Sequence, residues 1–237
     1  MGAPGWSYSE DDAKRCLKVL LAIEVVLAAI FVFTHTVVPG WGVIGSLFDV
    51  GLDLSIPSWF STIQLFLVGA VFLLAAVNNH PQSRLPTAAL LALAAGFVFL
   101  SADEGAGIHE RITEEMADAD LTFLLFKGNH GGWVVIYAVL AVVILVATRR
   151  WIALLWTDFR REATLGAMGV GIYLAGAAGL EVIGYQTEEG SKGTIDSLRI
   201  AVEELMEMAG VSTILYGALL LALTVSSPHA RGAVDTA

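Results

Sequence analysis

Six long runs of apolar residues constrain this chain more than any other feature of its sequence. Each run is long enough, or nearly so, to cross a hydrocarbon core of roughly 30 Å as a helix of about 20 residues. The runs are continuously apolar and do not alternate with a period of two, so the pattern favours helices over a β-barrel. The expected helices cover residues 16–38, 58–77, 87–112, 133–148, 163–185 and 197–225.

The composition agrees with a membrane protein. Hydrophobic residues make up 56% of the chain and charged residues only 15%, whereas a soluble domain carries about 25% charged residues. We therefore expect an all-α polytopic integral membrane protein with one six-helix transmembrane domain over residues 14–227. A polar segment, 1–13, precedes this domain and a tail, 228–237, follows it. Nothing in the sequence indicates a nucleic-acid-binding surface.

The positions of the basic residues predict the orientation of the chain. With both termini in the cytoplasm, nine lysines and arginines lie on the cytoplasmic side and four outside, as the positive-inside rule requires. The nine are Lys14, Arg15, Lys18, Arg84, Arg149, Arg150, Arg160, Arg161 and Arg231. The sequence therefore predicts a multi-pass protein of a prokaryotic plasma membrane, with cytoplasmic N- and C-termini and an acidic outer face.

Carboxylates and histidines recur near the outer ends of the apolar runs. Counted from the expected cytoplasmic helix ends, four helices place such groups in one layer roughly 26–28 Å up, just under the outer boundary of the core. The layer contains His35, Asp103, Glu104, Glu181 and Glu207. Four further groups lie one to two helical turns higher, namely His109, Glu110, Glu203 and Glu204.

This layer predicts a metal site. Carboxylates crowded at low dielectric constant need protonation or a compensating cation, and helical bundles use carboxylates and imidazoles to bind iron, manganese or zinc. We expect a membrane enzyme, hydrolytic or redox, with Glu110 and Glu203 as catalytic groups. The expected ligands are Asp103, Glu104, His109, Glu181, Glu207 and His35. The sequence lacks a Glu-x-x-His pair and does not favour haem, because only His35 and His109 could face each other.

Two other functions fit the same residues. The first is a cation- or proton-coupled transporter, in which the acids form an outward-facing binding site and Glu24 continues the path inward. Glu24 stands alone in the middle of the first apolar run, as a member of a proton relay or as a neutral acid hydrogen-bonded to a neighbouring helix. The second is a structural or accessory subunit of a larger membrane complex, in contact with other subunits or with copies of itself. The lipid bilayer is an expected partner in every case.

The sequence also predicts how two segments meet their surroundings. The helix expected over 163–185 is rich in glycine, and small residues at spacings of three and four allow helices to approach closely in lipid. Residues 149–161, RRWIALLWTDFRR, form an amphipathic segment expected on the cytoplasmic leaflet, where its arginines favour anionic lipid.

Overall fold

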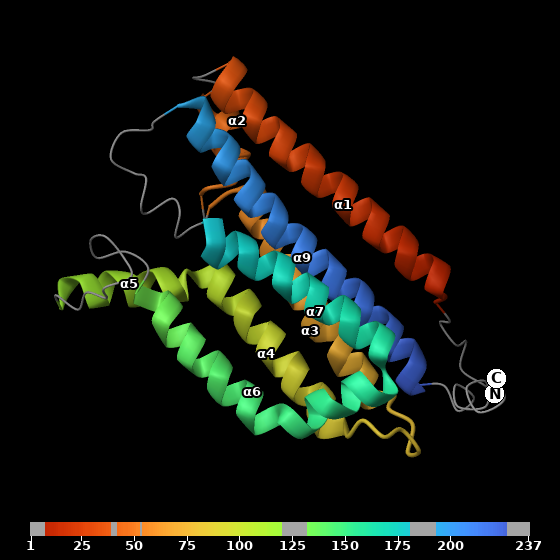
Figure 1. Cartoon of the computed structure of the whole chain (residues 1–237). Coiled ribbons are helices and arrows are strands. Elements are labelled where there is room, and N and C mark those ends of the chain that lie inside the picture. The colour runs from red at the N-terminus through yellow and green to blue at the C-terminus, as the bar shows by residue number, and fades with distance from the viewer. Residues whose placement is uncertain (1–7, 39–41, 53, 120–131, 181–192, 227–237) are drawn as a thin grey trace.

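All regular structure that the computed structural model describes is helical (Figure 1). The described residues are 8–38, 42–52, 54–119, 132–180 and 193–226. Within these ranges six helices are long and apolar enough to cross a membrane, which confirms the predicted all-α, multi-pass architecture. The six spans are Glu10–Val37, Ile56–Val77, Thr87–Ala106, Trp133–Asp158, Arg160–Leu180 and Thr194–Ser226.

Two of the spans end in a π-helical segment and the other four are single α-helices. α1 (Glu10–Val32) continues into η1 (Phe33–Val37), and α7 (Arg160–Leu174) continues into η2 (Ala175–Leu180). The single α-helices are α3 (Ile56–Val77), α4 (Thr87–Ala106), α6 (Gly132–Asp158) and α9 (Thr194–Ser226). Two short helices, α2 (Gly42–Leu47) and α5 (Ile108–Asp118), follow the first and third spans.

The first span begins six residues earlier than the apolar pattern indicates, because a capping box starts α1. The Ser9 side chain accepts a hydrogen bond from the Asp12 amide at 3.2 Å, and the Asp12 carboxylate accepts one from the Ser9 amide at 2.9 Å. These two bonds satisfy amides that a helix start leaves open. Counted from Glu10, His35 lies roughly 38 Å along the span.

The third span is shorter than expected because Gly107 interrupts it. Gly107 has a φ of 59°, a left-handed conformation that glycine adopts without the penalty of a side chain. The chain therefore turns at this residue, and α5 runs across the end of α4 instead of extending it (Figure 1).

The fourth span is longer than expected and includes most of the amphipathic segment. Residues 149–158 contain no glycine or proline and are rich in good helix formers, so α6 continues to Asp158. Phe159 then separates α6 from α7, which begins three residues before the predicted position 163.

Helix α9 forms the centre of the bundle. It packs against α1, α3 and α7, and α4 lies against α3 (Figure 1). In its most apolar 18-residue window, 72% of the residues of α9 are buried, whereas none of the corresponding residues of α6 is buried. Since α6 packs mainly on α5 and α7, most of its apolar surface is left to face lipid, which agrees with the predicted bilayer contact.

Glycines let α7 and α9 approach each other closely. A Cβ atom at Gly169 would lie 2.6 Å from the Gly210 carbonyl oxygen, and one at Gly210 would lie 2.6 Å from the Tyr173 amide nitrogen. At Gly176 a Cβ would lie 2.8 Å from the Glu203 carbonyl oxygen. Side chains larger than hydrogen cannot occupy these positions unless the helices move apart.

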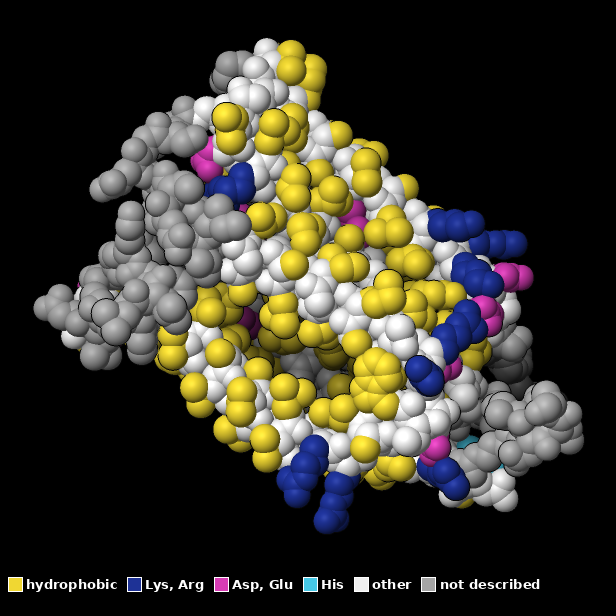
Figure 2. Space-filling model, viewed as in Figure 1, with side chains coloured by type: hydrophobic (Ala, Val, Ile, Leu, Met, Phe, Trp, Pro, Cys, Tyr) yellow, Lys and Arg dark blue, Asp and Glu magenta, His cyan; other side chains and the backbone are white. Residues whose placement is uncertain are grey.

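Basic side chains gather at one end of the bundle, which we call the basic end (Figure 2). Contacts hold the helices together there: Arg161 of α7 reaches Glu10 of α1 at 2.7 Å, and Arg84 reaches Asp158 of α6 at 3.2 Å. The described residues of this group are Lys14, Arg15, Lys18, Arg84, Arg149, Arg150, Arg160 and Arg161. The predicted orientation rests on this distribution and stays a prediction.

Candidate functional site

A triad of polar side chains lies inside the bundle where α1, α3 and α9 meet. Glu24 of α1 and Ser212 of α9 are fully buried, and Gln64 of α3 is 1% exposed. Glu24 lies roughly 21 Å from the start of α1, and Ser212 lies the same distance from the end of α9. The triad is therefore far from the basic end and enclosed by apolar spans.

The three side chains form a closed set of hydrogen bonds around one carboxyl oxygen. Gln64 Nε2 donates to Glu24 Oε1 and to Ser212 Oγ, both at 2.8 Å. Ser212 Oγ donates to the same Glu24 Oε1 at 2.6 Å. Glu24 Oε2 and Gln64 Oε1 have no hydrogen-bond partner among the described residues. One oxygen of the acid thus accepts two bonds while two other oxygens of the triad are unused.

This geometry fits a neutral carboxyl group. An ionised carboxylate without a cation is costly to bury, and the described contacts of Glu24 are both with neutral side chains. In a neutral acid, Oε1 is the carbonyl oxygen and can accept both bonds. Oε2 then carries a proton, and Gln64 Oε1 offers an unused acceptor in the same triad.

The triad lies close in depth to the acidic turn of α4. Ser101 Oγ of α4 donates to the Thr62 carbonyl oxygen of α3 at 2.8 Å, and a Cβ atom at Gly105 would lie 3.2 Å from Thr62 Cγ2. Gln64 is two residues further along α3, which is roughly 3 Å along the helix axis. The turn that carries Asp103 and Glu104 is therefore level with the residues just above the triad.

Asp103 links three helices. Its Oδ1 accepts hydrogen bonds from the His109 amide at 2.9 Å and from the Tyr137 hydroxyl of α6 at 3.0 Å. Its Oδ2 lies 3.2 Å from His109 Nδ1. The N-cap residue of α5, Gly107, has no side chain that could cap the helix, and Asp103 satisfies one of the open amides in its place. The carboxylate is 7% exposed, so it belongs to the packed structure.

The Asp103 carboxylate holds the His109 ring in place and acts to raise the pKa of His109. Burial acts to lower the pKa of His109, but the hydrogen bond and charge of Asp103, together with the charges of Glu104 and Glu110, outweigh burial and raise the pKa above 6.5. The ring packs 5.1 Å from the Trp133 ring. No described residue forms a hydrogen bond with Nε2, and a carboxylate on Nδ1 is the arrangement that orients metal-binding histidines.

The other predicted ligands of α4 and α9 act on a tyrosine of α7 through their charges. Glu104 and Glu207 act electrostatically on Tyr173, as do Asp103 and Glu204. Gly176 of η2 allows α9 to pass closely, because a Cβ there would lie 3.0 Å from Glu207 Cγ.

The two predicted catalytic residues have separate surroundings. Glu203 accepts a hydrogen bond from Arg199 Nη1 at 2.6 Å, and Arg199 also binds Asp196 at 3.1 Å. Glu110 lies in the first turn of α5, with its Oε2 2.9 Å from where a Cβ atom of Gly107 would be. The structure does not bring Glu110 and Glu203 into a described contact, and their catalytic roles stay predictions.

His35 contacts other residues than the predicted ligands. Its Nδ1 lies 3.0 Å from the Phe31 carbonyl oxygen and its Nε2 lies 3.1 Å from Asp49 Oδ2. Both partners are acceptors, so in this arrangement neither nitrogen is turned toward a metal ion. His35 is thus paired with Asp49, which follows the first span, and none of its described hydrogen bonds involves a predicted ligand.

The predicted metal site as a whole stays a prediction. Glu181 lies outside the described residues. In the part of the chain that the structure describes, no group of three or more histidine, cysteine or acidic side chains is arranged to hold a metal ion. Within the predicted ligand set, Asp103 and His109 are in direct contact, at 3.2 Å.

Sequence reasoning identified Glu24 but not its partners. A carboxylate in the middle of an apolar run is a clear signal, and Gln64 is a second, weaker one because it is the polar residue of an otherwise apolar span. Ser212 could not be predicted as a partner of Glu24. Serine is common in membrane spans, and the sequence alone does not show which neighbouring helix a given face of α9 contacts.

A family model described as "Domain of unknown function (DUF8692)" matches residues 19–223, a range that contains the whole triad. No curated protein and no solved structure matches the chain.

Proposed function

The chain belongs to the DUF8692 family, and on the geometry of its buried triad we propose that it is a proton-coupled transporter of cations. The observation that carries this proposal is Glu24: a fully buried acid bound by neutral side chains from two other spans, with one oxygen unused. Ionisable residues inside a membrane are costly and mark ion or proton pathways.

The hydrogen-bond directions support a proton as the coupling ion. Gln64 Nε2 and Ser212 Oγ both donate to Glu24, so each turns a hydrogen toward the acid. A metal cation needs lone pairs from its ligands, whereas a proton needs only the carboxyl oxygen. A proton also makes the buried group neutral, which removes the cost of burying a charge.

The acids at the end of the bundle opposite the basic end attract the cation that is exchanged for the proton. Glu104, Glu204 and Glu207 act on Tyr173, and acids concentrated on one face attract cations. The acidic turn of α4 is level with α3 just above Gln64, so a cation entering there approaches the triad. Its charge favours the ionised form of Glu24 and releases the proton, and departure of the cation favours reprotonation.

We further propose the orientation that the positive-inside rule gives. The basic end faces the cytoplasm, the acids face outward, and the protein resides in the plasma membrane. In this orientation, cations reach the acids from outside the cell. Glu24 exchanges its proton deeper in the bundle, between the two membrane surfaces.

Transport by reconstituted protein tests the proposal. Proteoliposomes loaded with a pH-sensitive dye are challenged with Na⁺, K⁺, Mg²⁺ or Ca²⁺, and a cation-dependent change in internal pH is expected for the wild type. Glu24→Gln cannot release a proton and should lose the response. Glu115→Gln changes an exposed acid of α5 and is the matched control, with wild-type response expected. Absence of a response to every cation, or an equal response in Glu24→Gln, contradicts the proposal.

A metal-dependent enzyme is the second candidate, and the orientation of His109 favours it. Asp103 holds Nδ1 at 3.2 Å, which leaves Nε2 as the nitrogen for a zinc, iron or manganese ion. Elemental analysis of gently purified protein tests this candidate. It requires a stoichiometric metal that is lost in His109→Ala and kept in His80→Ala, a histidine of the α3–α4 connection. Metal at background level in the wild type argues against it.

A further inference from the structure

A shallow, open cavity of about 560 Å³ lies on the surface at the basic end, between the first turns of α7 and the facing part of α9. Four of its lining residues come from α7 and one from α9, namely Arg160, Arg161, Thr164, Leu165 and Tyr216. The cavity combines two guanidinium groups with an apolar wall.

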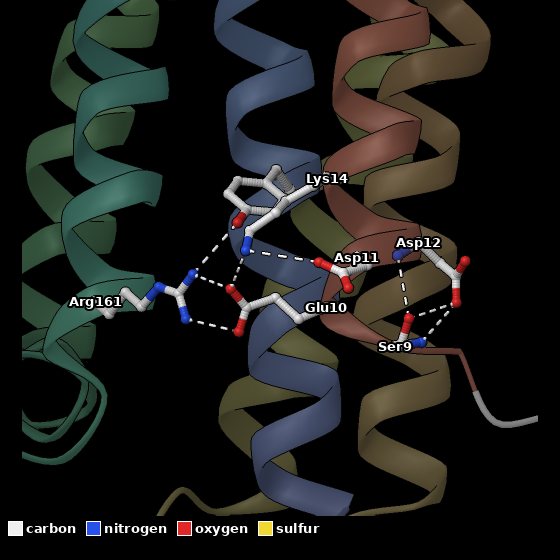
Figure 3. Close-up of polar contacts among 7 residues, drawn as sticks. Ser9, Glu10, Asp11, Asp12, Lys14 and Arg161 are labelled. Atoms are coloured by element: carbon white, nitrogen blue, oxygen red, sulfur yellow. Dashed lines mark hydrogen bonds and ion pairs between the residues drawn. The ribbon is translucent and has the colours of Figure 1, made fainter.

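Arg161 is fixed in place by Glu10. Its Nη1 and Nη2 donate to the two carboxylate oxygens of Glu10 at 3.0 and 2.7 Å, and Nη2 is 3.4 Å from the Tyr216 hydroxyl (Figure 3). Glu10 also binds Lys14 Nζ at 2.9 Å. Asp11 lies 3.9 Å from the same Lys14 Nζ (Figure 3), so Glu10 and Asp11 balance Arg161 and Lys14, and the unbalanced positive charge at the cavity comes from Arg160.

Arg160 carries this positive charge and is available to a ligand. Its side chain is exposed, and it forms no hydrogen bond or ion pair with any described residue. No described side chain caps the start of α7, so the first amides of this helix add partial positive charge at the same place. The nearby Glu162 accepts a hydrogen bond from Thr224 of α9 at 3.2 Å.

The opposite wall of the cavity is apolar. Leu165 and Tyr216 pack with Ala13 and Leu220 in a small hydrophobic cluster between α1, α7 and α9. A ligand in this cavity thus meets cationic groups at the level of the basic end and apolar groups deeper between the spans. A phospholipid has this order of chemistry, with a phosphate at the membrane surface and apolar chains below it.

We propose that this cavity binds the headgroup of an anionic phospholipid. Arg160 is the main ligand of the phosphate, because arginine binds phosphate with two parallel hydrogen bonds. Arg161, held by Glu10, lines the same cavity, and the glycerol and upper acyl chains lie against Leu165 and Tyr216. The site is separate from the Glu24 triad and does not depend on the proposed transport.

Native mass spectrometry and thermal unfolding of the full chain in detergent test the site. Phosphatidylglycerol should bind and raise the unfolding temperature, whereas phosphatidylcholine and inorganic phosphate at equal concentration should not. Arg160→Ala should bind phosphatidylglycerol about fivefold more weakly, which is the effect of one arginine at a membrane surface. Arg150→Ala removes an exposed arginine of α6 at the same end and should bind like the wild type.

Three results overturn the proposal. Equal weakening by Arg150→Ala and Arg160→Ala indicates unspecific attraction to the basic end, and equal stabilisation by inorganic phosphate indicates a site for a free anion. Arg160→Gln, which keeps a long polar side chain without charge, is the second variant. Its lipid binding must fall like that of Arg160→Ala, and wild-type binding by both variants also overturns the proposal.

Discussion

At the scale of single residues, the buried acids Glu24 and Asp103 differ in their hydrogen-bond partners. Glu24 is bound by neutral donors on one oxygen, which suits a group that carries a proton. Asp103 is bound by an amide, a hydroxyl and an imidazole, which suits a group that stays charged and holds helices together. Two buried carboxyl groups thus have different surroundings: Glu24 meets only neutral donors among the described residues, whereas Asp103 is paired with His109.

Ser212→Ala tests whether the triad contributes to stability. It removes a donor to Glu24 Oε1, and a polar contact between spans is worth about 1 kcal/mol, so the free energy of unfolding should fall by about that amount. Unfolding in mixed micelles measures it. Thr213→Ala is the control, because this hydroxyl bonds only the Ala209 carbonyl of its own helix. Equal stability of the two variants contradicts the role given to Ser212.

The raised pKa of His109 predicts a pH dependence in metal-free protein. The pKa of His109 in the folded state lies above the ordinary 6.5. The stabilisation of the fold by the contact with Asp103 is therefore fully present below about pH 6.5 and is lost as the pH rises through the raised pKa. The unfolding temperature of the wild type should exceed that of His109→Gln by a constant margin below pH 6.5, and the margin should shrink above it. A margin that grows with pH contradicts the ion pair.

At the scale of helices, close packing of α7 on α9 depends on the absence of side chains. The two helices meet at Gly169 and Gly210, where Gly210 approaches Tyr173, and one turn further along Gly176 approaches Glu207. Anything that separates them also changes the surroundings of the acids near Tyr173.

Gly210→Ala tests this contact. The new Cβ would lie 2.6 Å from the Tyr173 amide nitrogen and 2.7 Å from the Gly169 carbonyl oxygen, and such overpacking costs about 1–3 kcal/mol. Gly171→Ala is the control, since no described atom outside its own helix backbone and neighbouring residues lies within 4 Å of that Cβ. The control should be neutral or slightly stabilising, because alanine favours helices. Chemical unfolding of both variants measures the difference.

The sequence predicts where the helices are better than where they end or meet. All six spans follow from continuous apolar runs, since burial in lipid dominates their formation. The ends depend on local chemistry: the capping box at Ser9 extends α1, and the left-handed Gly107 ends α4. The triad depends on which helix faces meet, which apolar runs of low periodicity do not specify, so Gln64 and Ser212 could not be assigned as partners of Glu24.

At the scale of the whole molecule, charge is divided between the two ends. Eight of the described lysines and arginines lie at the basic end, with Arg111 and Arg199 at the other. The cavity at Arg160 and the acids around Tyr173 are thus at opposite ends of the bundle, and the triad lies between them. This division of charge supports both proposals, the binding of anionic lipid at the basic end and the attraction of cations at the other end.

Cysteine labelling tests this orientation. In a Cys16→Ala background, Arg150→Cys places a single thiol at the basic end, and Ser46→Cys places one in the exposed helix α2 at the other. In intact cells a membrane-impermeant maleimide should label Ser46→Cys alone, and Arg150→Cys should react only after permeabilisation. Labelling of Arg150→Cys in intact cells contradicts the orientation.

The protonation of Glu24 is the central claim, and infrared spectroscopy of the purified protein measures it directly. The wild type should show a carbonyl band of a protonated carboxyl group that is absent in Glu24→Gln, shifts in Ser212→Ala and gives way to a carboxylate band when a transported cation is added. If the spectra of the wild type and Glu24→Gln share the same protonated-carboxyl bands, Glu24 carries no proton and the account is contradicted.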